Sequence, residues 1–237
     1  MLPVLFRSVA FDIWENAIVA GLINAVWISA AFVLGIACTA VAAAAPGLAF
    51  LLIGASVAFL FALLGPVGIY LEILARRETP DFPTLLSAML RSLGGSMLVA
   101  LGGLAALSLL AFAFPLALGL PDALAVAAAI LIGWTSIMAL QWTALAIGQC
   151  DGVQTSPVAA ARIAAVRVLS RPAHSGLLLL GALVLMATLV ILLPGPCGAA
   201  LLLRRAARLA GDPAEFDRTA NAMSRRTTRS VLFPWKP

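Results

Sequence analysis

Charged side chains are scarce in this sequence: they make up 11% of its 237 residues, whereas 63% of the residues are hydrophobic. Soluble domains carry about 25% charged and about 45–50% apolar residues. A water-soluble core has no room for this much apolar surface, so the chain is built for lipid as its main solvent. The apolar runs are long and do not alternate with polar residues, which excludes a barrel and predicts an all-α, polytopic transmembrane helical bundle.

Histidine and cysteine are also rare, with one histidine and three cysteines in the whole chain. A lone histidine at a predicted membrane boundary, His174, gives no Ser/His/Asp arrangement, and no glycine loop followed by Lys-Ser/Thr is present to bind phosphate. Cys38, Cys150 and Cys197 lack metal-ligand spacing. We therefore expect no enzyme activity, no metal and no cofactor. His174 is a weak candidate to ligate a haem or chlorin, although such a histidine is more often simply solvated.

Five runs without a charge reach the roughly 20 residues that a membrane span needs. They cover residues 17–44, 47–71, 95–118, 123–148 and 177–203. The N-terminus does not resemble a cleaved signal peptide, because it lacks a basic start and its first run exceeds a signal core of about 7–15 residues. We expect a single transmembrane domain over residues 1–209, followed by a basic cytoplasmic tail over residues 210–237.

Basic residues before the last run lie on one side of the predicted membrane. The loops on the other side, "AAPG" and "FPLALGLPD", contain none. The excess of arginine marks the cytoplasmic side, so the N-terminus and both long loops are expected in the cytoplasm. The arginines outside the spans on that side are Arg7, Arg91 and the five topology anchors Arg76, Arg77, Arg162, Arg167 and Arg171.

The last apolar run contains its own interruption, Pro194-Gly195-Pro196. Proline removes a backbone donor and clashes with the preceding turn, so a helix must break there. A helix over residues 177–203 would be about 40 Å long, which is too short for two crossings of about 30 Å each. We expect a broken last element, or a partial hairpin, with a cytoplasmic tail; an exterior tail is the alternative. Pro66 is expected to bend the second span at its boundary, with a gate as the alternative.

Two amphipathic helices are expected in the cytoplasmic loops. Apolar residues recur at helical period over residues 82–93, and Gly94-Gly95 should end or bend that helix. Ser156-Pro157 is a good start for the second helix, and Pro172 should stop it. Because each half would then run span, amphipathic helix, span, the layout suggests a parallel internal repeat. A further short helix is expected in the tail, from "GDPAEF" to about Met223.

The predicted span centres contain no ionisable residue, and Asn24 and Gln141 are their most notable polar groups. The usual role of such residues is a hydrogen bond between helices, and lining a pathway is the alternative. Glu72 and Arg76 have the spacing of an ion pair at a helix end. Small residues that favour close helix packing recur at Gly21, Ala25, Ser29, Gly54, Ala58, Ala62, Gly95 and Gly103.

Three stretches resemble the YesL-like family of uncharacterised bacterial integral membrane proteins. They are the Asn-x-x-Trp start "LINAVWISAAFVLG", the loop "GPVGIYLEILARRETPDFPTLLSAMLRS" and the ending "LLPGPCGAALLLRRAARLA". The resemblance implies an integral-membrane accessory protein, since some members are encoded near sugar-uptake systems. It supplies no catalytic residues.

The sequence therefore predicts a non-enzymatic accessory, assembly or structural subunit of a membrane complex in the bacterial cytoplasmic (inner) membrane. The alternative is a small transporter or permease component, with a pathway near Asn24 and Gln141 and breaks at Pro66 and Pro194. An enzyme that acts on lipid is a distant third. Expected partners are the lipid bilayer, other membrane subunits and anionic lipid head groups at the tail segment "SRRTTRS", with no nucleic acid.

Overall fold

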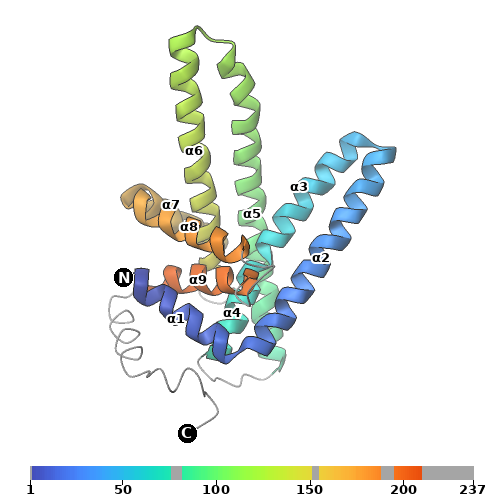
Figure 1. Cartoon of the computed structure of the whole chain (residues 1–237), viewed down its shortest axis with the longest axis vertical. Helices are drawn as coiled ribbons and strands as arrows, with labels where there is room; N and C mark the ends of the chain where they lie inside the picture. Colours follow the sequence, from blue (N-terminus) through green and yellow to red (C-terminus); the bar gives the residue numbers. More distant parts are fainter. Residues whose placement is uncertain (1, 76–81, 151–154, 188–194, 210–237) are drawn as a thin grey trace.

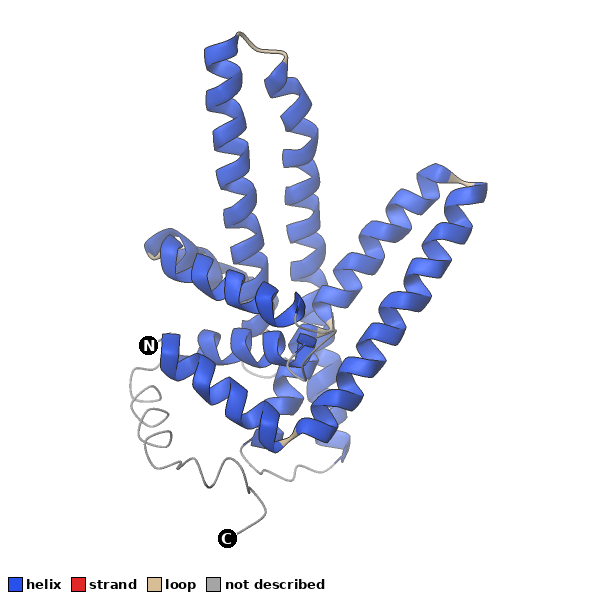
Figure 2. Ribbon diagram, viewed as in Figure 1, coloured by secondary structure: helices blue, strands red, loops and turns tan. Residues whose placement is uncertain are grey.

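The computed structural model describes residues 2–75, 82–150, 155–187 and 195–209, and in these residues every regular element is an α-helix (Figure 2). The all-α prediction is thereby confirmed. The helices are α1 (Leu2–Glu15), α2 (Ala17–Ala44), α3 (Pro46–Ala62), α4 (Leu64–Ala75), α5 (Phe82–Leu118), α6 (Asp122–Gln149), α7 (Pro157–Ser170), α8 (Pro172–Ala187) and α9 (Gly195–Leu209).

Four helical stretches are long and apolar enough to cross a membrane, which indicates a multi-pass membrane protein. They are Ala17–Ala44, Gly47–Ala75, Phe82–Leu118 and Asp122–Gln149. There are up to five if α7 and α8, whose axes are bent by 113° at the break between them, together make one span. The second stretch joins α3 to α4 across Leu63, whose amide donates to the Phe59 carbonyl and whose carbonyl accepts from Val67.

The long helices form two antiparallel hairpins, α2–α3 and α5–α6, that diverge from a common base (Figure 1). Helices α1, α4 and α9 lie in that base, at the ends of the hairpins opposite to their turns. Large apolar side chains along both hairpins are exposed, as expected for surfaces that face lipid. The buried core and the polar contacts between distant parts of the chain are therefore concentrated in the base.

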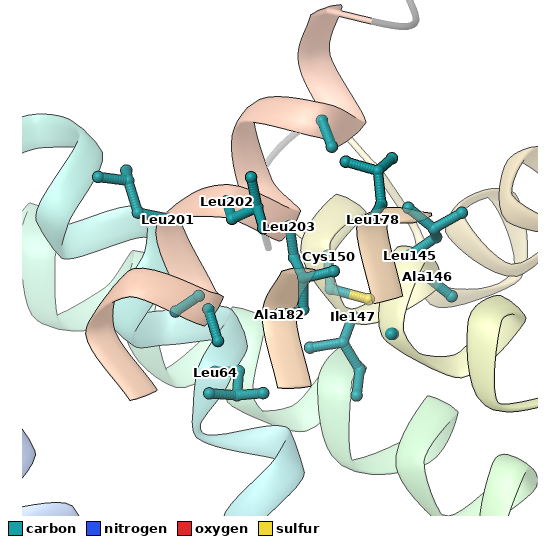
Figure 3. Close-up of a cluster of buried hydrophobic side chains, with 14 of the residues drawn as sticks. Leu64, Leu145, Ala146, Ile147, Cys150, Leu178, Ala182, Leu201, Leu202 and Leu203 are labelled. Carbon is teal, nitrogen blue, oxygen red and sulfur yellow. The ribbon is translucent and has the colours of Figure 1, made fainter. Parts of the chain in front are cut away.

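Helix α9 is the centre of the base. It packs against α1, α2, α4, α6 and α8, and its residues from Gly195 to Arg204 are all buried. Figure 3 shows Leu201, Leu202 and Leu203 of α9 among apolar side chains of α4, α6 and α8. A helix of this length spans only about 22 Å, so its burial comes from neighbouring helices on several sides.

The predicted last span, residues 177–203, falls on two helices. Helix α8 ends at Ala187 and α9 begins at Gly195, and the two pack against each other. Pro196 lies buried in the first turn of α9, where its missing N–H breaks no helical hydrogen bond. Pro194 lies outside the described residues. Pro66 likewise lies in the first turn of α4, next to the junction with α3.

The first amphipathic helix is not a separate element, which corrects the sequence prediction. Helix α5 runs without a break through Gly94 and Gly95 to Leu118. Each glycine costs a helix only about 1 kcal/mol relative to alanine, and at Gly95 an added Cβ would lie 3.3 Å from Pro157, so the glycine lets α7 begin close to α5. The two halves of the chain therefore do not share the layout on which the internal repeat was based.

The second predicted loop helix is α7, and its two ends are as expected. The Ser156 hydroxyl accepts a hydrogen bond from the Ala159 amide, and Pro157 occupies the first helical turn. The helix ends at Ser170, directly before the Arg171 cap and Pro172. The tail helix predicted up to Met223 lies outside the described residues.

Candidate functional site

Two arginines of α9 converge on one buried carboxylate of α4. Arg204 Nε donates to Glu72 Oε2 at 3.2 Å, and Arg208 Nη1 lies 2.7 Å from Glu72 Oε1. Arg204 also donates through Nη1 to the Gly148 carbonyl at the end of α6, at 3.2 Å. Glu72 and Arg204 are both buried, whereas the Arg208 side chain is about a third exposed, so the cluster joins α4, α6 and α9 through a buried ion pair with one partly exposed arginine beside it.

A second ion pair joins α9 to α1. Arg205 pairs with the buried Asp12 and also donates to the Ser8 hydroxyl. Asp12 lies on α1, which leads directly into α2, and Glu72 lies on α4, which continues from α3. Both acids therefore lie at the base end of the α2–α3 hairpin. The C-terminal half of α9 therefore lies on the same side of the molecule as the N-terminal helix.

Asn24 of α2 binds the start of α9. Its Oδ1 accepts a hydrogen bond from the Cys197 amide at 3.0 Å, and the Cys197 thiol contacts the Ala20 carbonyl at 3.5 Å. The first amides of a helix have no partner within the helix, and Asn24 supplies one for α9. Gly195, with φ of 31°, adopts the left-handed conformation that glycine tolerates at this entry.

Gln141 and its neighbour Trp142 hold the α7–α8 elbow, which we define as residues 157–187. The Gln141 carbonyl oxygen accepts from the Ser175 hydroxyl of α8 at 2.7 Å. Trp142 Nε1 donates to the Ala161 carbonyl of α7 at 2.8 Å. Both polar residues that stood out in the predicted spans, Asn24 and Gln141, thus make contacts between helices.

A further polar contact lies between α5 and the end of α6, where the Ser92 hydroxyl donates to the Cys150 carbonyl at 2.6 Å. One turn further along α5, Ser96 lies against Gly65 of α4. The Ser96 hydroxyl and Gln149 Nε2 are buried without a hydrogen-bond partner among the described residues. This junction of α4, α5 and α6 is therefore close-packed, and two of its buried polar groups lack a hydrogen-bond partner among the described residues.

The small residues singled out in the sequence differ in their surroundings. Ala58 and Ala62 are buried, Gly54 lies against Leu104, and an added Cβ at Gly103 would meet Thr143 of α6. On α2, by contrast, Ala25 and Ser29 are exposed and Gly21 is half-buried. The packed face of α2 is the one that carries Ala20 and Asn24. The small residues Gly21, Ala25 and Ser29 therefore lie outside the surface through which α2 contacts its neighbours.

The remaining candidates are dispersed. His174 is half-buried in the first turn of α8. Arg162 and Arg171 are exposed and Arg167 is half-buried, whereas Arg76 and Arg77 lie outside the described residues. Among the described residues, no three histidine, cysteine or acidic side chains gather in a way that could hold a metal ion.

The ion-paired base was missed from the sequence. The predicted partner of Glu72, Arg76, lies outside the described residues. The partners that the structure describes are Arg204 and Arg208, which approach from α9 and were not predicted. A usable signal was present, because Arg204 and Arg208 lie four apart and share a helix face directly after an apolar run. Local spacing favoured the nearer arginine, and nothing in the sequence placed α9 against α4.

The comparisons with known proteins add no relative: no protein-family model, curated protein or solved structure matches the chain. The resemblance to the YesL-like family remains a prediction from the quoted residues.

Proposed function

We propose that this protein is a non-enzymatic, multi-pass component of the bacterial cytoplasmic membrane that acts as an accessory, assembly or structural subunit of a larger membrane complex. The observation that supports this most directly is the use of Asn24 and Gln141. The side chain of each accepts a hydrogen bond from another helix, which is the usual role of polar residues in packed membrane helices. The exposed apolar faces of both hairpins offer area for lipid and for other membrane subunits.

The experiment is native purification of the full chain in a mild detergent, followed by mass spectrometry. We expect a larger membrane protein to accompany the chain in a fixed ratio. The opposite result is a monodisperse monomer that moves solute in liposomes and loses that flux in Asn24→Ala or Gln141→Ala. That result would replace the proposal by a transporter.

One observation favours the transporter as the second candidate. Helix α9 begins inside the bundle, at Gly195, and its early amide at Cys197 binds the side chain of a long apolar helix. Transporters often place the N-termini of broken helices at the substrate site. The matched variants are Asn24→Asp and Asn24→Ala. A carboxylate at position 24 can still accept the hydrogen bond from the Cys197 amide, whereas alanine cannot. If flux needs only this contact between α2 and α9, it should be retained in Asn24→Asp and lost in Asn24→Ala.

The proposal includes an orientation, with the N-terminus and the C-terminal tail both in the cytoplasm. It is supported by the ion pair of Arg205 with Asp12, which holds the end of α9 beside α1, and by the arginines of the loops. A cysteine at Ser224 should react with a membrane-impermeant maleimide only after the cells are opened. The three native cysteines are buried, so the unaltered chain is the control. Labelling of Ser224→Cys in intact cells would contradict this orientation.

A further inference from the structure

The α7–α8 elbow contains three arginines and no acid. Arg162, Arg167 and Arg171 are its charged side chains. None of the three has an ion pair in the described part of the chain. The three arginines of α9 differ in this respect, because each of them is paired with Glu72 or Asp12.

The neighbouring helices leave this charge unbalanced. Helix α7 packs against α5, α6 and α8. The only acid on those three helices is Asp122, at the opposite end of α6. The three helices packed against α7 therefore supply no carboxylate near its arginines.

Arg167 is the most constrained of the three. It is half-buried, and its Nη1 is fully enclosed without a hydrogen-bond partner among the described residues. Helix α7 is not one of the four long apolar helices. Partial burial of Arg167 lowers the pKa of its guanidinium from its ordinary value. The group still carries its charge at neutral pH, and no carboxylate among the described residues neutralises it.

The outer face of α7 carries large apolar side chains around the exposed Arg162, which lies four residues from both Val158 and Val166. Val158, Val166 and Leu169 are 79%, 61% and 73% exposed, whereas Ala160, Ala164 and Val168 on the opposite face are buried. Exposed apolar side chains together with arginines are the composition of a helix that lies in the interface of a membrane. Figure 1 shows α7 crossing α6 near its base end instead of running along it. The contacts of Gln141 and Trp142 fix this position.

We propose that the α7–α8 elbow is a binding site for anionic phospholipid, in which Val158, Val166 and Leu169 contact the acyl chains and Arg162, Arg167 and Arg171 bind the lipid phosphate. Arginine suits this role, because its planar guanidinium matches phosphate oxygens in two parallel hydrogen bonds. The exposed valines and leucine select a lipid over a free anion, since only a lipid covers them. This inference does not depend on whether the protein is an accessory subunit or a transporter.

The test uses the full chain in an uncharged detergent, with lipid binding followed by native mass spectrometry. Dioleoyl phosphatidylglycerol is the probe, and dioleoyl phosphatidylcholine and inorganic phosphate are the comparisons. We expect phosphatidylglycerol to bind in preference to phosphatidylcholine, and added phosphate not to displace it. Because each arginine near an anionic surface contributes about a fivefold factor in affinity, the variant R162Q/R167Q/R171Q should bind phosphatidylglycerol at least about 25-fold more weakly.

The matched single variants are Arg167→Gln and Arg91→Gln. Arg91 is an exposed arginine of α5 that donates to Ser87 and lies outside the elbow. The first change should weaken phosphatidylglycerol binding about fivefold, and the second should leave it within about twofold. Equal effects of the two changes, equal binding of both lipids, or displacement by inorganic phosphate would each overturn the proposal.

If the triple variant does not fold, the salt dependence of lipid binding by the unaltered protein tests the proposal instead. Its affinity for phosphatidylglycerol should fall with rising salt, because salt screens the arginine charges. Its weaker binding of phosphatidylcholine should change little. An affinity for phosphatidylglycerol that is independent of salt would overturn the proposal.

Discussion

Replacing Glu72 with glutamine is expected to destabilise the protein by about 3–5 kcal/mol, because the change leaves a buried arginine without its counter-charge. Arg204 is only 5% exposed, whereas the side chain of Arg208 is about a third exposed and can be hydrated. For a chain of this size the melting temperature should fall by roughly 10 °C. Thermal unfolding of the detergent-solubilised protein measures the effect.

Asp122→Asn is the control for this change. Asp122 is an exposed acid in the first turn of α6, and its replacement should change stability by no more than about 0.5 kcal/mol. The double variant E72Q/R204Q should recover part of the loss, since it removes both members of the pair. A Glu72→Gln protein that melts within a degree of the unaltered chain would show that the α4–α9 ion pair does not hold the base together.

The class of protein could be predicted because it depends on quantities that the sequence displays directly. The scarcity of charge and the length of the apolar runs determine that the chain is helical and suited to a membrane. The start of α7 could also be predicted, because the Ser156 cap and Pro157 act within one turn of the helix. These signals are local, and no knowledge of the tertiary structure is needed to interpret them.

The base could not be predicted, because its contacts join positions that are far apart in the chain. Arg205 reaches Asp12 across 193 positions, and Arg204 reaches Glu72 across 132. A charge at the edge of an apolar run is also ambiguous, since the same arginine suits a topology anchor, a solvated end or a buried pair. Only the position of α9 in the centre of the base decides among these roles.

Helices α1 and α5 illustrate the two opposite errors. Helix α1 was not predicted, although Leu5, Val9 and Ile13 repeat every four residues and are all buried against the base. Helix α1 is short and contains the charged residues Arg7 and Asp12, so it does not stand out as a long apolar run does. In α5 the pair Gly94-Gly95 was expected to end or bend the helix, but the helix continues through both glycines, and Gly95 lies close to Pro157.

Two glycine-to-alanine changes on α6 are expected to alter stability in opposite directions. At Gly148 an added Cβ would lie 2.7 Å from the Leu203 carbonyl oxygen and 3.2 Å from the Leu203 Cβ. The nearest of these atoms belong to the backbone of α9, so α9 would have to shift, at a cost of about 1–3 kcal/mol. At Gly133, in the exposed middle of the same helix, nothing lies within 4 Å, and alanine should stabilise by about 0.5–1 kcal/mol.

The comparison separates close packing of α6 on α9 from the general helix preference of alanine, because both changes add the same methyl group to the same helix. Gly148 also presents the carbonyl that accepts from Arg204, so a shift of α9 would weaken the ion-paired base as well. Thermal unfolding of the two variants side by side measures the difference. Equal stabilisation by both changes would mean that α9 does not approach α6 closely, and the dependence of the base on Glu72 would then lose its structural reason.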